Sequence, residues 1–97
     1  MSTEDLENYE AERELQLAQE YRDVSGMFSY AVETERRFYL ANEVSVNVVG
    51  DGARPVIEVT LRDAWVWDMY RQSRFVPNVR VVTFKDVNVE ELPRKEL

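Results

Sequence analysis

The residues of this chain that could perform chemistry are carboxylates. Glu33 and Glu35 stand two positions apart, so in a strand both side chains would lie on one face. Such a pair can hold a hydrated Mg²⁺ ion, because this cation prefers oxygen ligands. A metal-dependent nuclease would need a further carboxylate, for which the candidates are Glu58, Asp63 and Asp68. The alternative, which we prefer, is that these acids face solvent or pair with Arg36, Arg37 or Arg62.

Other common catalytic and metal-binding arrangements are excluded by residue type. The chain has no histidine and no cysteine. Zinc sites need those ligands, and catalytic triads need the same side chains. Its three glycines do not supply a phosphate-binding loop. We therefore expect a noncatalytic protein with no metal site and no cofactor.

A stretch rich in aromatic rings and arginine, residues 63–75, is the strongest candidate for a binding surface. It contains both tryptophans of the chain. The candidate binding residues are Trp65, Trp67, Tyr70, Arg71, Arg74 and Phe75, together with Arg36 and Arg37. Tryptophan, tyrosine and arginine are enriched where proteins bind proteins, and aromatic rings beside arginine also stack on nucleic-acid bases. The third interpretation is that the rings fill the core. The exposure of the rings decides between a core and a binding face.

Acidic charge is concentrated toward both ends of the chain, whose net charge is −7. Residues 1–35 carry ten acids and two bases, residues 36–85 eight bases and five acids, and residues 86–97 four acids and two bases. This division predicts either an acidic helix attracted to a basic sheet or an acidic surface offered to a basic partner. The overall negative sign disfavours nonspecific binding to nucleic acid, since phosphate contacts dominate that affinity.

The hydropathy pattern predicts no contact with a membrane. No apolar run approaches the roughly 20 residues that span a bilayer. The first five residues include two acids, unlike the start of a signal peptide. We expect a cytoplasmic protein with a single domain, residues 1–97.

The elements that must position these residues begin with one amphipathic helix at residues 3–25. Ser2 or Thr3 can cap its N-terminus. Its apolar residues fall within about 120° on a helical wheel; they are Leu6, Tyr9, Leu17, Tyr21 and Val24. We expect Tyr9 and Tyr21 to pack on a sheet. Leu15 falls on the opposite side and hints at a second contact.

Alternating apolar residues then predict an antiparallel sheet of about four strands. The strands are expected near residues 27–33, 37–49, 56–62 and 79–85, followed by an acidic tail at 86–97. Gly50-Asp51-Gly52 is the strongest turn signal and predicts a hairpin between the second and third strands. The aromatic stretch continues the third strand or forms a short helical turn. The fold class is α+β, with the N-terminal helix packed on the sheet.

Several segments of the chain resemble a known family. They include Val32-Glu33-Thr34-Glu35-Arg36-Arg37-Phe38-Tyr39-Leu40, Asp63-Ala64-Trp65-Val66-Trp67-Asp68-Met69-Tyr70-Arg71 and Val79-Arg80-Val81-Val82-Thr83-Phe84-Lys85-Asp86. These runs resemble a small actinobacterial family catalogued as domain of unknown function 2469. The resemblance covers nearly the whole chain and implies an actinobacterial cytoplasmic protein, but it assigns no functional residue.

Three functions therefore stay open, in this order. The first is a noncatalytic interaction module that binds an unknown protein partner or forms a homo-oligomer. The second is an accessory protein that contacts RNA or DNA through an arginine and aromatic face. The third is a magnesium-dependent enzyme that uses converging carboxylates.

Overall fold

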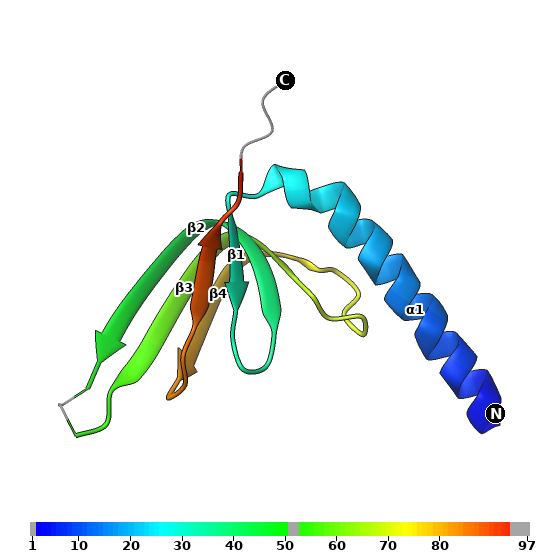
Figure 1. Cartoon of the computed structure of the whole chain (residues 1–97), viewed down its shortest axis with the longest axis horizontal. Coiled ribbons are helices and arrows are strands. Elements are labelled where there is room, and N and C mark those ends of the chain that lie inside the picture. Colours follow the sequence, from blue (N-terminus) through cyan, green and yellow to red (C-terminus); the bar gives the residue numbers. More distant parts are fainter. Residues whose placement is uncertain (1, 51–52, 94–97) are drawn as a thin grey trace.

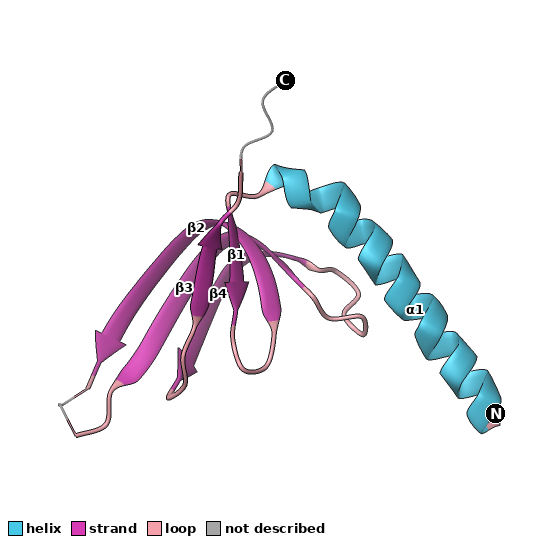
Figure 2. Cartoon of the chain, in the orientation of Figure 1, coloured by secondary structure: helices cyan, strands magenta, loops and turns pink. Residues whose placement is uncertain are grey.

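The fold consists of one long helix followed by strands that pair into one sheet. The computed structural model describes residues 2–50 and 53–93. Helix α1 spans Thr3–Val24 and a 3₁₀ turn, η1, spans Ser25–Met27; the strands are β1 Tyr30–Glu33, β2 Phe38–Val49, β3 Val56–Val66, β4 Phe75–Thr83 and β5 Asn88–Glu91. The strand order is β4-β3-β2-β1-β5, and all neighbours are antiparallel. The α+β prediction is confirmed, with five strands where about four were expected (Figures 1 and 2).

The ends of α1 are set by local chemistry. The Ser2 hydroxyl oxygen accepts a hydrogen bond from the backbone N–H of Asp5 at 3.2 Å, which caps the helix as predicted. The helix ends at Val24 because Ser25–Met27 tightens into the 3₁₀ turn. This turn also delays the first strand, which begins at Tyr30 and not near residue 27.

Strands β2 and β3 form the predicted hairpin. Their pairing runs from Tyr39 opposite Val66 to Val49 opposite Val56. Gly50 has φ +109°, a backbone conformation that glycine adopts without strain. The Asp51-Gly52 part of the predicted turn lies outside the described residues. Because β3 extends to Val66, the aromatic stretch begins as a continuation of this strand.

Strands β4 and β5 differ from the prediction. Strand β4 begins at Phe75, four residues before the expected start, and includes Pro77. A proline lacks the backbone N–H needed inside a sheet, but β4 is an edge strand and tolerates it. Strand β5 lies inside the segment that was predicted to be an acidic tail, and it pairs with β1. Its residues are all exposed, so their sequence carries little hydrophobic pattern.

The long strands bend sharply near their middle. Ala41 and Val44 of β2 both belong to one apolar cluster, as do Leu61 and Ala64 of β3. Residues on one face of a regular strand are separated by an even number of positions, so the odd spacing shows that the pleat is interrupted. The interruption coincides with Asp63, whose φ is +53°. Figure 1 shows the bend where β2 and β3 turn over at the top of the view.

The inner side of this bend holds a continuous core. Buried residues from both halves of the strands meet there; they are Val32, Tyr39, Ala41, Val59, Leu61, Ala64 and Val66. The bend also brings the end of β4 near the β1–β2 turn, since the Thr83 hydroxyl donates to the Glu35 carboxylate at 3.0 Å. The sheet therefore curls around its own core.

Helix α1 covers part of the outer side of the sheet. Leu17 and Val24 of the helix share a second buried cluster with Leu40 and Trp65 of the sheet. Only the C-terminal half of the helix takes part, and Figure 1 shows the N-terminal half projecting away from the strands. The Cα radius of gyration is 16.0 Å, whereas a compact domain of this length has about 12.5 Å. Within the described part of the chain, no helix has the length and hydropathy of a membrane span.

Candidate functional site

The aromatic stretch is divided between the core and the surface, beginning with a fully buried tryptophan. Trp65 has 0% exposure and packs against α1. Its indole Nε1–H donates to Oε1 of Glu20 at 2.8 Å. A buried indole N–H needs such an acceptor. Trp65 therefore belongs to the core, which contradicts its prediction as a binding residue.

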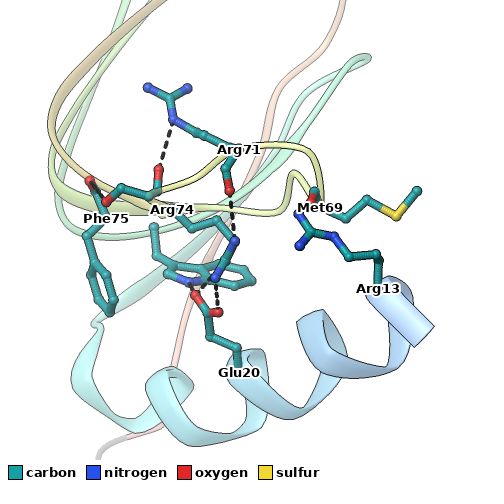
Figure 3. Close-up of polar contacts among 8 residues, drawn as sticks. Arg13, Glu20, Met69, Arg71, Arg74 and Phe75 are labelled. Carbon is teal, nitrogen blue, oxygen red and sulfur yellow. Dashed lines mark hydrogen bonds and ion pairs between the residues drawn. The ribbon is translucent and has the colours of Figure 1, made fainter. Parts of the chain in front are cut away.

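Glu20 also binds Arg74, which joins the helix to the segment before β4. The guanidinium Nε donates to Glu20 Oε1 at 2.6 Å, and Nη2 pairs with Oε2. Figure 3 shows Glu20 reaching from α1 to the Arg74 guanidinium. The hydrogen bond from Arg74 lowers the pKa of Glu20; burial opposes this shift and the Trp65 bond adds to it. Arg74 is thereby committed to an internal ion pair.

Trp67 lies at the margin of the same aromatic cluster. Its ring centroid is 5.4 Å from that of Tyr21 and 5.9 Å from that of Trp65, and 37% of the residue is exposed. Its backbone N–H donates to the Phe38 carbonyl at 2.9 Å, which fixes its position. Trp67 thus presents one side of its ring to solvent beside α1.

The loop between β3 and β4 contacts the middle of α1, as the pink segment beside the helix in Figure 2 indicates. Arg13 donates from Nη2 to the Met69 carbonyl at 2.6 Å, and the Tyr70 hydroxyl donates to Glu10 Oε1 at 3.2 Å. Tyr70 is nevertheless 66% exposed. These contacts hold the helix against the loop and leave most of Tyr70 exposed to solvent.

The N-terminal half of α1 continues the apolar stripe into solvent. Leu6 and Tyr9 are 47% and 51% exposed. Both lie on the helix side that carries the buried Leu17 and Val24. The expectation that Tyr9 packs on the sheet is wrong because the helix extends past the strands, whereas Tyr21 packs as expected.

The remaining candidate residues make local contacts or lie in the neighbouring β1–β2 turn. Phe75 is half exposed, and its ring stacks on Phe28 with centroids 6.4 Å apart. The exposed Arg71 donates from Nε to the Ser73 carbonyl at 3.0 Å. Arg36 and Arg37 are exposed in the β1–β2 turn, and Arg37 lies 3.7 Å from Asp68.

Of the candidate carboxylates, Glu33 is exposed at the end of β1, and the other four contact neighbouring groups. Glu35 accepts from Thr83 and lies 3.6 Å from Lys85. Glu58 pairs with Arg80 at 2.9 Å. Asp63 accepts from Asn42 at 2.6 Å, and Asp68 accepts from the backbone N–H of Tyr70. Within residues 2–50 and 53–93, no group of three such ligands is placed to hold a metal ion.

The role of Glu20 and the exposure of Leu6 were not predicted from the sequence. Glu20 falls on the apolar side of the helical wheel beside Leu17, Tyr21 and Val24. A carboxylate in that position needs a partner, so the signal was present in the sequence. No pattern in the sequence indicates that Leu6 is exposed, because its exposure depends on where the helix extends past the sheet.

Comparison with known proteins identifies relatives of the whole chain. The model of the family described as "Protein of unknown function (DUF2469)" matches residues 1–97. Uncharacterized proteins from Mycobacterium bovis (strain ATCC BAA-935 / AF2122/97) and from two strains of Mycobacterium tuberculosis are 61% identical over 97 residues, which is 100% of this chain and 96% of each relative. No solved structure matches the chain.

Proposed function

The chain belongs to the DUF2469 family, and we propose that it is a noncatalytic module that binds a protein partner through one composite surface. This surface, the α1 prong, consists of Leu6 and Tyr9 on the projecting half of α1 and Tyr70 and Trp67 on the adjacent loop. The observation that carries the proposal is the apolar stripe of α1, which is buried at one end and exposed at the other. Exposed apolar side chains that gather on one side of a molecule, with polar residues around them, mark interaction sites.

The prong is held in position before any partner arrives. Arg13 connects its two parts, with the guanidinium carbon 5.9 Å from the Tyr9 ring centroid and Nη2 bonded to the Met69 carbonyl. The Tyr70–Glu10 hydrogen bond lies on the same side of the helix. A surface that is already ordered loses less conformational entropy on binding. This arrangement suits recognition better than a loose terminal segment would.

Charge indicates what kind of protein would bind. Residues 3–14 contain six acids and one arginine, a net charge of −5. Two copies of this segment brought together would repel each other, since like charges at an interface oppose association. The favoured partner is a different protein with a basic rim around an apolar groove, which takes the helix as an amphipathic ligand. A homo-oligomer through the prong is therefore the weaker alternative.

The test compares three tagged baits in a lysate of the source organism. They are the wild-type chain, a double variant with Leu6→Ser and Tyr9→Ser, and a control with Leu15→Ser. Leu15 is also an exposed helix leucine, but on the opposite side of α1. Surface substitutions of this type change stability by about 0.5 kcal/mol or less, so all three baits should remain folded.

We expect one protein, identified by mass spectrometry, to be captured by the wild type and the Leu15 control but not by the double variant. The purified partner should then bind the chain directly, with affinity that falls as salt rises. Equal capture by all three baits would refute the prong as the contact surface. Loss of capture after nuclease treatment would favour nucleic acid, and a dimer abolished by the double variant would favour a second copy.

A further inference from the structure

A groove lies between the β1–β2 turn and the end of β4. It has a volume of about 610 Å³ and is lined by the β1–β2 turn, residues 34–37, and by residues 80–84, which comprise the last part of β4 and Phe84. Tyr39 lines it from the core side. The volume falls in the range of small-molecule sites, about 300–1,000 Å³.

The charge of the groove is opposite to that of the whole chain. Arg36 and Arg37 stand on one side, in a protein whose net charge is −7. The Glu35 carboxylate also lines the groove; it accepts a hydrogen bond from Thr83 and lies 3.6 Å from the exposed Lys85 ammonium. The Arg37–Asp68 pair is long, 3.7 Å, and its guanidinium is half exposed, so it exchanges readily. No ion pair engages Arg36 within the part of the chain that the structure describes.

The core side of the groove offers a further hydrogen-bond donor. Tyr39 is a buried residue that lines the groove, and its hydroxyl can donate one hydrogen bond. Burial raises the pKa of Tyr39, although the charges of Arg37 and Arg71 oppose the rise. The phenol therefore stays protonated at neutral pH, and its O–H can donate a hydrogen bond to a bound anion. Two guanidiniums and a phenol make a set of donors suited to an anion with several oxygens.

The opposite rim of the groove carries an exposed aromatic ring. Phe84 is 74% exposed and directly follows β4. An exposed ring of this kind provides a face on which a planar base can stack. The groove thus combines cationic donors on one side with an aromatic ring on the other.

We propose that this groove binds a nucleoside phosphate, with Arg36, Arg37 and the Tyr39 hydroxyl on the phosphate and Phe84 on the base. A free nucleotide and the phosphorylated end of a nucleic-acid strand share this chemistry. The proposal does not rest on the α1 prong, because none of the prong residues lines the groove; Arg37 borders both, since it also lines a hollow with Trp67 and Tyr70.

The test is a titration of the isotope-labelled full chain followed by amide NMR. The probes are pyrophosphate, adenosine monophosphate and a single-stranded oligonucleotide with a 5′-phosphate. We expect adenosine monophosphate to shift the amide signals of residues 34–39 and 80–84 and to bind more tightly than pyrophosphate. Phe84→Ala should bring its affinity down to that of pyrophosphate. Tighter binding of the oligonucleotide than of adenosine monophosphate would identify a strand end as the source, and weaker binding of the oligonucleotide would identify the free nucleotide.

Variants of the two arginines decide whether the groove is responsible. Arg36→Gln and Arg37→Gln should each weaken binding about tenfold, since each removes a charge-assisted contact. Arg22→Gln is the matched control, because Arg22 is an exposed arginine in the last turn of α1. Spectra without a probe report whether each variant is folded. Shifts that avoid the groove, or affinity unchanged in both arginine variants, would overturn the proposal.

Discussion

Replacing Glu20 by alanine should destabilise the attachment of α1 to the sheet. The substitution leaves the Trp65 indole N–H without an acceptor in a residue that has no exposed surface. An orphaned buried donor costs about 1–3 kcal/mol. The lost Arg74 pair adds about 1 kcal/mol, a discounted value because the two side chains are 21% and 25% exposed. The expected loss is therefore about 2–4 kcal/mol, a large part of a typical stability of about 5–15 kcal/mol.

Urea unfolding followed by circular dichroism would measure this loss. We expect a midpoint lower by about 1–3 M with an unchanged slope, because the surface exposed on unfolding stays the same. Glu20→Gln keeps an oxygen for the indole and loses only the charge, so it should cost about 1 kcal/mol. Glu12→Ala is the control, since Glu12 is an exposed residue of the same helix. If the Glu20→Ala protein were as stable as the Glu12→Ala protein, the Glu20 carboxylate would not stabilise the packing of α1 on the sheet.

Three further predictions concern pH, the tryptophans and the bend. The folded pKa of Glu20 lies below its ordinary value of 4.5, so its stabilisation is present above that value and is lost as the pH falls through the folded pKa; wild type should lose more stability than Glu20→Gln in acid unfolding curves. Trp65→Ala should cost about 3–5 kcal/mol in urea unfolding, and Trp67→Ala clearly less because its ring is partly exposed; equal costs would contradict the assigned burial. Asp63→Ala should cost about 1–3 kcal/mol, because alanine is strained at φ +53° and cannot accept from Asn42; a loss within the error of the urea measurement would mean that Asp63 does not maintain the bend.

The helix and the central hairpin could be predicted because their signals are local. Ser2 supplies a capping oxygen, and the glycine at position 50 marks a turn between two alternating strands. Strand β5 could not be found in this way. Its residues are exposed, and what orders them is pairing with β1, whose pairing edge exists only in the folded sheet.

The bend could not be predicted from the sequence either. The residue at the bend, Asp63, has a positive φ, and aspartate tolerates that conformation but also adopts others, so its presence does not predict a bend. The alternation of β3 therefore looks regular on both sides of Asp63 while the facing residues change from odd to even positions. An alternating pattern with a fixed period of two therefore assigns the wrong residues of β3 to the core after Asp63. The inner core could be predicted as apolar, but the pairing of its two halves could not.

Which rings of residues 63–75 are buried depends on the path of the helix and not on the alternation of apolar and polar residues within this stretch. Trp65 and Trp67 stand two positions apart, and their ring centroids lie 5.9 Å from each other, yet only Trp65 is fully covered. The same contrast appears on α1, where Leu17 is buried and Leu6 is exposed although both lie on one helix side. In each pair the difference is whether helix and sheet overlap at that position. Because the overlap ends near Trp67 and the middle of α1, the strongest case for a partner surface lies where the helix and the sheet separate. This surface includes Tyr9, which the sequence predicted to pack on the sheet.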